Sequence, residues 1–299
     1  MTHIAMLTAC LLATAQPQMV PPVFVHARTE QNVITLINGL LAVRVQYDIK
    51  KGTFTASRGG RTFVAEGRLV EKDAPGGTAK TVDLRDSLGQ GKAVEVTWPD
   101  GRVRRLALYE DLPFVCTSGS GRNATDKPVT VENVTPLVAR VDAGAAPDKL
   151  RGFGPEGPYE IADPKTQFCF AAAAEPKGRA GIVCGWITHH RGSGVVTMGV
   201  DKGRLTLEGQ SQYGRLVVPA GATVEGEVLG IGLFEDCLAG LEAYAGACAK
   251  AHQIKLPGRV PSGYCTWYHA GPSDEKRLAE LAAFAGKHLR PFGFDFVQI

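Results

Sequence analysis

Residues Gly181–Phe234 read GIVCGWITHHRGSGVVTMGVDKGRLTLEGQSQYGRLVVPAGATVEGEVLGIGLF. Short apolar runs alternate in this stretch with segments rich in Gly, Asp and other polar residues, and within several runs apolar and polar side chains alternate. A period of two residues is typical of strands with one face in a core and one in water. The stretch therefore predicts strands at Gly181–Thr188, Gly194–Val200, Arg204–Glu208, Tyr213–Val218 and Thr223–Phe234.

The same pattern continues toward the amino terminus. Apolar alternation recurs at Leu41–Tyr47, Val94–Trp98 and Val103–Tyr109. The segment Trp98–Arg102 (WPDGR) predicts a hairpin, because Pro fixes one backbone angle of a tight turn and Gly adopts the positive φ that it requires. We therefore predict a mainly β chain in which residues 20–235 form a large antiparallel β-sandwich.

Composition excludes several classes of protein. The chain has 299 residues, of which 44% are hydrophobic and 21% charged, so a disordered chain does not fit. The 36 Gly and 18 Pro residues favour many turns over long helices. The net charge is +3 without a long run of one sign, so we expect no nucleic-acid partner.

The amino terminus resembles an export signal. Met1–Gln16 reads MTHIAMLTACLLATAQ, an apolar segment that ends in the small-x-small pattern Ala13-Thr14-Ala15. We predict a signal peptide at residues 1–15 and a secreted or periplasmic protein. Because the head of the segment has His3 but no Lys or Arg, a frayed chain start stays as the alternative. No other segment is long enough for a membrane span.

The cysteines do not suggest a metal site. Beyond Cys10 of the leader there are six, without a CxxC motif and without His at zinc-ligand spacing. Contexts such as Phe168-Cys169-Phe170 and Val183-Cys184-Gly185 favour packing in the core over a disulfide framework. We expect no bound metal.

From Asp236 the hydrophobic period lengthens to that of a helix. Leu238, Leu241, Tyr244, Ala245 and Cys248 fall on one stripe of a helix that would run to about Gln253. A Pro- and Gly-rich segment follows and ends it. Residues 236–259 are therefore predicted as a linker helix and connection.

The carboxyl-terminal residues predict a β-α-β unit. Ser262–Tyr268 is an aromatic strand, Ser273 would cap a helix whose apolar face begins at Leu278, and Phe294–Ile299 is a second strand. Such a unit makes parallel strands, whose apolar faces need a cover that so short a unit lacks. We therefore expect residues 260–299 to be the truncated start of a (β/α)8 barrel, and the chain to be the amino-terminal part of a longer protein.

Two segments of this unit carry a family resemblance. PSGYCTWY at Pro261–Tyr268 and GFDFVQI at Gly293–Ile299 resemble the start of the catalytic barrel in glycoside hydrolase family 36, which holds α-galactosidases and the raffinose-synthase group. The sandwich is similar to that family's amino-terminal domain in four blocks: VENVTPLVAR at Val131–Arg140, GWITHHRGSGVV at Gly185–Val196, LVVPAGATVEGEVLGIGLFED at Leu216–Asp236 and LEAYAGACAK at Leu241–Lys250.

The resemblance implies a retaining glycosidase that acts on α-galactosides. The family's nucleophile and acid/base aspartates lie on later barrel strands, so it implies no catalytic residue in this chain. It implies that Trp267 stacks on a sugar ring and that Tyr268 flanks it at the carboxyl end of the first strand. A homo-oligomer is a further possibility. The alternatives are a non-catalytic carbohydrate-binding or oligomerisation sandwich, and part of a raffinose-synthase-like galactosyltransferase.

Other patterns favour structural roles. GFGPEG at Gly152–Gly157 has the GxGxxG spacing, but Pro155 and Pro158 exclude the helix that would bind phosphate, so we expect a loop and no cofactor. Neighbouring side chains on a strand point to opposite faces, so His189 and His190 fit a pair beside a turn better than a metal site.

Acidic residues also favour structural roles. The pairs Glu110-Asp111 and Glu235-Asp236 are expected to be solvated. His269 and Asp295, near the predicted barrel strands, are expected to form hydrogen bonds within the barrel wall.

Overall fold

The computed structural model describes residues 25–70, 77–267 and 274–298. The chain divides into two compact units, Met1–His252 and Gln253–Ile299. The predicted signal peptide at residues 1–15 lies outside the described residues, and its prediction stays untested. Within the described residues no helix has the length and apolar character that crossing a membrane requires.

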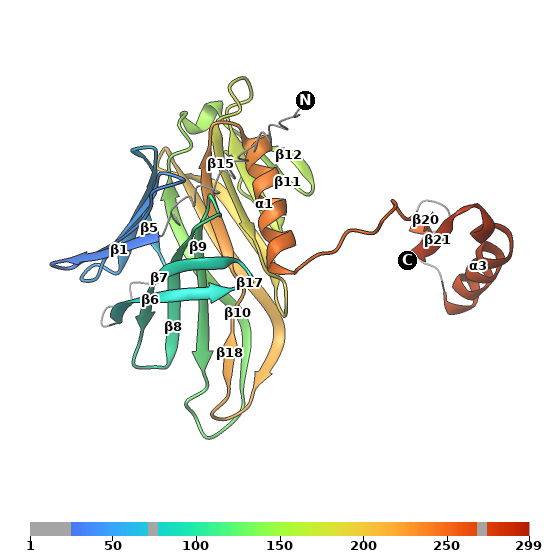
Figure 1. Cartoon of the computed structure of the whole chain (residues 1–299), viewed down its shortest axis with the longest axis horizontal. Coiled ribbons are helices and arrows are strands. Elements are labelled where there is room, and N and C mark those ends of the chain that lie inside the picture. The colour runs from blue at the N-terminus through green and yellow to red at the C-terminus, as the bar shows by residue number, and fades with distance from the viewer. Residues whose placement is uncertain (1–24, 71–76, 268–273, 299) are drawn as a thin grey trace, which may run out of the picture. The chain divides into compact units, whose positions relative to one another are not determined.

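The first unit contains two large sheets whose paired strands are antiparallel throughout (Figure 1). One sheet has the order β1-β2-β3-β4-β5-β10-β17-β16-β13. Its strands are β1 Val25–Glu30, β2 Val33–Asn38, β3 Val43–Asp48, β4 Thr53–Arg58, β5 Arg61–Arg68, β10 Val129–Val141, β13 Lys165–Phe168, β16 Ser193–Asp201 and β17 Arg204–Val218.

The other sheet has the order β12-β11-β14-β15-β19-β9-β8-β7-β6, and β18 also pairs with β9. Its strands are β6 Thr78–Asp86, β7 Gly89–Thr97, β8 Arg102–Tyr109, β9 Val115–Arg122, β11 Arg151–Gly154, β12 Gly157–Glu160, β14 Phe170–Ala174, β15 Gly181–Trp186, β18 Thr223–Glu225 and β19 Leu229–Phe234. A short 3-10 turn, η1, spans Pro147–Lys149. The predicted mainly β fold with large antiparallel sheets is confirmed.

The main core lies between the two sheets, because one cluster of buried side chains draws on both. Phe54 and Leu137 come from the first sheet, and Leu106, Trp186 and Ile231 from the second. The indole Nε1 of Trp186 donates a 3.0 Å hydrogen bond to the carbonyl oxygen of Val195, so this polar atom is satisfied inside the core.

The second sheet is buried on its other face as well, where helix α1 (Cys237–Ala251) packs (Figure 1). Strand β15 is buried at every position: Ile182 and Cys184 face the main core, whereas Val183 belongs to the cluster under α1. Burial on both faces explains why β15 and β19 are continuous apolar runs without alternation.

Helix α1 begins at its predicted position, but its buried face agrees only in part with the predicted stripe. Asp236 is its N-cap and accepts a 2.9 Å hydrogen bond from the Leu238 amide. The predicted stripe is wrong at Leu238, which is 55% exposed, and at Ala245, which is also exposed. It is right at Tyr244, which is buried, and at Leu241 and Cys248, which are partly buried against the sheet. The buried residues are Cys237, Gly240, Tyr244, Ala247 and Ala251. Small residues dominate this face because the helix lies close to the sheet: a Cβ at Gly240 would be 2.7 Å from the Phe234 ring.

The hairpin turn predicted at Trp98–Arg102 is present in the structure. In the predicted hairpin, the Trp98 amide donates to the Arg102 carbonyl over 2.9 Å, and Gly101 has φ of +85°. Three strand predictions need correction. Arg204–Glu208 and Tyr213–Val218 are parts of one continuous strand, β17, whereas the predicted strand Thr223–Phe234 is two strands, β18 and β19, separated by residues 226–228. Between the two segments of β17 its pairing with β10 shifts register at β-bulges, and the strand continues through them.

The second unit contains a parallel pair, β20 (Ser262–Cys265) and β21 (Phe294–Gln298), joined through helix α3 (Glu275–His288) and the 3-10 turn η2 (Arg290–Phe292). The predicted strand, helix and strand are present, but the first strand, predicted as Ser262–Tyr268, ends at Cys265. The N-cap of α3 is Asp274, which accepts a 2.8 Å hydrogen bond from the Arg277 amide, whereas the predicted cap Ser273 lies outside the described residues.

The six described cysteines are all free. Cys116, Cys184 and Cys237 are buried, as the core interpretation predicts. Cys169 is exposed, and the prediction is wrong there. It lies between β13 and β14 at φ of +64°, where the chain passes from one sheet to the other and turns the side chain outward.

Candidate functional site

Trp267 lies just beyond the carboxyl end of β20. The preceding residue, Thr266, is buried, and its amide donates a 3.0 Å hydrogen bond to the carbonyl of Gln298 at the end of β21. The Trp267 side chain is 67% exposed. Tyr268, the other predicted sugar-binding residue, and His269 lie outside the described residues.

Asp295 has a structural role in the second unit, as expected. Its carboxylate pairs with the Arg259 guanidinium, with one bond of 2.8 Å from Nη1, and accepts a 2.9 Å hydrogen bond from the Ser262 amide. The Arg259 side chain first and the Ser262 amide second hold the pKa of Asp295 below its usual value. Through these bonds the carboxylate of Asp295 in β21 holds the chain segment with which β20 begins.

The acidic pairs also have structural partners. Asp111 pairs with the Lys250 ammonium over 3.2 Å, and Asp236 caps α1 and pairs with Arg179 over 2.7 Å. The GxGxxG segment forms the hairpin of β11 and β12, with Gly157 at φ of +95° and no helix after it. It is therefore no phosphate-binding loop.

The histidine pair lies in the loop after β15, near the end of α1. The rings of His189 and His190 have their centroids 6.3 Å and 4.9 Å from that of His252. Glu227 is buried beside this loop and accepts hydrogen bonds from the Thr188 hydroxyl at 2.6 Å and the Arg191 amide at 2.7 Å. The described part of the chain contains no group of His, Cys, Asp or Glu suited to hold a metal.

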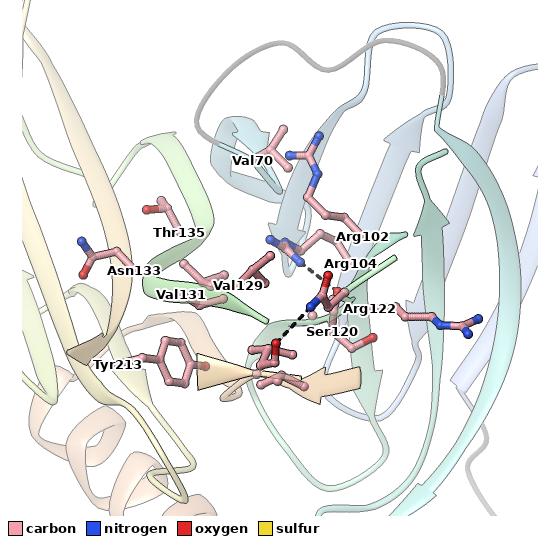
Figure 2. Close-up of a pocket in the computed structure, with 17 residues that line it drawn as sticks. Val70, Arg102, Arg104, Ser120, Arg122, Val129, Val131, Asn133, Thr135 and Tyr213 are labelled. Atoms are coloured by element: carbon pink, nitrogen blue, oxygen red, sulfur yellow. Dashed lines mark hydrogen bonds between the residues drawn. The ribbon is translucent and has the colours of Figure 1, made fainter. Parts of the chain in front are cut away.

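Sequence reasoning missed a cavity of about 660 Å³ in the first unit (Figure 2). Strands β8, β9 and β18 of one sheet and β10 and β17 of the other line it. Its described lining consists of arginines, neutral polar residues, glycines and valines: Val70, Arg102, Arg104, Gly119, Ser120, Gly121, Arg122, Asn123, Val129, Val131, Asn133, Val134, Thr135, Tyr213, Val218, Val224 and Gly226. None of these is Asp or Glu.

Arg104 is the unusual member of this lining, because its side chain is only 8% exposed. Its Nη1 donates to the main-chain carbonyls of Val103 at 3.0 Å and Ser120 at 3.3 Å, the second of which Figure 2 shows. Its Nε is buried without a hydrogen-bond partner in the described structure. The sequence does contain a signal for this burial. Arg104 lies two and four residues before Leu106 and Leu108 on β8, so it shares a face with these two core leucines.

Burial sets the electrostatics of this arginine. Desolvation lowers the pKa of Arg104 and Arg102 lowers it further, whereas Tyr213 and Asp100 act in the opposite direction. Arg102 is already compensated, because its Nε pairs with the Asp100 carboxylate over 2.6 Å. The cavity therefore contains one buried guanidinium without a carboxylate partner among the described residues.

Asn123 illustrates a lining residue with a structural role. It begins one of two Asn-x-Thr patterns, Asn123–Thr125 and Asn133–Thr135, that fit the N-glycosylation acceptor pattern. The Asn123 Nδ2 donates to the carbonyls of Lys127 and Val218 over 2.7 and 3.0 Å, and its side-chain oxygen accepts from the Thr125 amide. This amide is occupied, whereas Asn133 is exposed.

Comparison of whole folds connects the chain to known structures. No protein-family model matches the sequence, and no curated protein matches it. The crystal structure of GH36 alpha-galactosidase AgaB from Geobacillus stearothermophilus matches with a TM-score of 0.52 and 10% identity, over 91% of this chain and 49% of that one.

Two further solved structures give similar values. The galactosidase domain of the alpha-galactosidase-sucrose kinase AgaSK matches with a TM-score of 0.49 and 12% identity, over 91% of this chain and 50% of that one. The alpha-galactosidase from Lactobacillus brevis matches with a TM-score of 0.48 and 10% identity, over 87% and 48%. The chain spans about half the length of these structures.

The match to AgaB includes part of the second unit. Met1–His252 amounts to 84% of the chain, that is 252 of 299 residues, and a match over 91% must extend beyond it. The resemblance seen in the sequence therefore holds at the level of the fold: this chain shares the fold of the amino-terminal region of GH36 alpha-galactosidases.

Proposed function

We propose that this chain corresponds to the amino-terminal part of an α-galactosidase-like glycoside hydrolase that acts on α-galactosides by a retaining mechanism. The observation that carries the proposal is the match to AgaB, which includes part of the β20-α3-β21 unit as well as the sandwich. A secreted or periplasmic location and a homo-oligomeric state are further parts of the proposal.

In this proposal the β20-α3-β21 unit is the start of a (β/α)8 barrel. Its two strands are parallel, and parallel strands occur almost only where both faces of the sheet are covered. Large apolar side chains of the unit are exposed: Phe292 is 88%, Phe284 57% and Phe296 42% exposed. Further barrel strands and helices would cover such surfaces.

Trp267 would then form one wall of the sugar subsite, with Tyr268 beside it. Sites in barrels of this type form at the carboxyl ends of the strands, and Trp267 lies just beyond the carboxyl end of β20 and is exposed. An aromatic ring offers an apolar face against which the C–H groups of a sugar can pack.

No residue of this chain is proposed to be catalytic. Retaining hydrolysis needs two carboxyl groups roughly 5–5.5 Å apart, one as the nucleophile and one as the acid/base. The described lining of the sandwich cavity contains no carboxylate. The proposal therefore assigns both carboxyl groups to barrel strands that this chain does not contain.

The test uses both the 299-residue chain and the protein encoded by the complete gene. We expect the complete protein to hydrolyse aryl α-galactosides with retention, and the 299-residue chain to show no turnover. In the complete protein, Trp267→Ala should lower kcat/KM by about tenfold or more, which is roughly 1.4 kcal/mol of transition-state binding, whereas Trp267→Phe should retain most activity. Turnover by the purified 299-residue chain, or an unaffected Trp267→Ala enzyme, would contradict the proposal.

The alternatives differ in their products. A raffinose-synthase-like enzyme would transfer the galactosyl group to a sugar acceptor in preference to water, so the ratio of transfer to hydrolysis separates the two. The presence of a cavity in the sandwich favours a binding module as the second candidate function. Such a module would bind carbohydrate, and the complete gene product would turn over none.

A further inference from the structure

The cavity of the sandwich contains a buried guanidinium that forms no ion pair with the described residues. Arg104 lies in it with 8% of its surface exposed, and no ion pair of its guanidinium is found within residues 25–70, 77–267 and 274–298. A buried charge without a partner costs several kcal/mol relative to a hydrated one, so proteins retain such charges mainly where something binds them.

The surrounding backbone holds this arginine in place. A Cβ at Gly119 would lie 2.6 Å from both Cδ and Nη1 of Arg104, so only glycine leaves room for the side chain to cross β9. The bonds of Nη1 to the carbonyls of Val103 and Ser120 fix the other end. The guanidinium is therefore preorganised before any ligand arrives, which reduces the entropic cost of binding.

The remaining lining indicates the size and polarity of the rest of an anionic ligand. Val129 and Val131, labelled in Figure 2, and Val134 supply apolar surface. Tyr213 and Asn133 supply neutral hydrogen-bonding groups. A volume of about 660 Å³ is within the range of small-molecule pockets and is large enough for one sugar ring. A bare inorganic anion would leave most of this surface without contact.

We propose that this cavity binds a hydroxylated organic acid of monosaccharide size, such as a sugar acid. Its carboxylate accepts hydrogen bonds from the guanidinium of Arg104, and its hydroxyl groups contact Tyr213 and Asn133. Charge-assisted hydrogen bonds between guanidinium and carboxylate are the strongest in proteins and favour planar oxyanions. This binding site is independent of the proposed glycosidase activity and lies in a different unit from Trp267.

The experiment compares two ligands that differ only at C6. Binding of D-glucuronate and D-glucose to the 299-residue chain is measured by calorimetry and by the shift in Tm, at low ionic strength. We expect saturable binding of glucuronate and at least tenfold weaker binding of glucose. Arg104→Gln should weaken glucuronate binding roughly tenfold or more, since it removes the charged hydrogen bond to the carboxylate.

Arg215→Gln is the matched control, because Arg215 is an exposed arginine on β17 outside the cavity lining, and it should bind glucuronate like the wild type. Tyr213→Phe, at a half-buried residue, should fold normally and weaken glucuronate binding. Inorganic phosphate is the third probe. The proposal is overturned if wild type does not bind glucuronate at roughly 10 mM, if glucose or phosphate binds as tightly as glucuronate, or if a folded Arg104→Gln variant keeps full affinity. If Arg104→Gln does not fold, an unchanged affinity of Tyr213→Phe overturns it.

Discussion

The hydroxyl of Tyr244 in α1 donates a 2.8 Å hydrogen bond to the carbonyl oxygen of Trp186, the last residue of β15. The ring lies directly over the sheet, since a Cβ at Gly185 would approach Cε2 of Tyr244 to 2.5 Å. Strand β15 ends at this residue, and the helix supplies a hydrogen-bond donor to its carbonyl. This bond ties α1 to the second sheet.

Tyr244→Phe should therefore destabilise the first unit. The substitution removes the 2.8 Å bond to a buried carbonyl and leaves it the weak Cys248 thiol contact of 3.7 Å and an interaction with the His189 ring, so we expect a loss of about 1–3 kcal/mol in the free energy of unfolding. Tyr159→Phe is the matched control, because the Tyr159 hydroxyl is buried and has no hydrogen-bond partner in the described structure. Its removal should be neutral or stabilising in urea unfolding. Equal losses for both variants would refute the role of the Tyr244 bond.

Glu227 should make stability depend on acid pH. Burial by itself raises the pKa of this carboxyl, but hydrogen bonds from Thr188, Arg191, His190 and Gly192 outweigh it and leave the pKa below its usual value. A pKa that is lowered in the folded state adds stability above the unfolded-state pKa of about 4.3, and this stability is lost as the pH falls through the folded-state pKa.

Glu227→Gln should thus cost about 2 kcal/mol at neutral pH, and the difference from wild type should shrink as the pH falls below about 4. Thermal unfolding of both proteins at neutral pH and at a pH below about 4 measures this difference in stability. His189 lies in the same loop, where burial lowers its pKa and the Glu227 carboxylate opposes that shift. Protonation of His189 therefore destabilises Glu227→Gln more than wild type, so the two are compared in a His189→Gln background. The control is Glu225→Gln, an exposed carboxyl two residues away. A difference that stays constant with pH would disprove the assignment.

Asn123 and Asn133 should respond differently to the same substitution. Asn123→Ala removes two well-formed hydrogen bonds to the carbonyls of Lys127 and Val218 in a buried site, so we expect a loss of about 2–3 kcal/mol. Asn133→Ala removes an exposed side chain and should change stability by less than about 0.5 kcal/mol. Chemical denaturation of both variants checks this, and similar values would show that the Asn123 network contributes little.

Limited proteolysis should separate the two units. Residues 253–261 have no helix or strand and are exposed, with Leu256 at 87% and Val260 at 88% exposure. Trypsin should cut first after Lys255 or Arg259 and leave a resistant fragment that contains the sandwich and α1. Mass spectrometry of the first products identifies the site. First cuts within the strands of the sandwich would show that this connection is not the weakest point of the chain.

The sequence by itself determined the elements whose causes are local. The hairpin at Trp98–Arg102 follows from residues that set their own backbone angles, and the start of α1 after Asp236 follows from the change to a helical hydrophobic period. The order of β20, α3 and β21 follows from a change of hydrophobic period within a short segment. Such signals lie within a few residues and need no knowledge of distant partners.

Only the tertiary structure decided which faces of these elements are buried. The sequence favours Leu238 for the buried stripe of α1, but the helix lies so close to Phe234 and Val183 that Gly240 contacts the sheet instead. Likewise, the pattern of β8 marks Arg104 as inward-facing, but the cavity around it exists only because β9, β10 and β17, distant in sequence, converge there. Packing between distant segments depends on shape and close approach, and a local pattern of polarity contains no information about either.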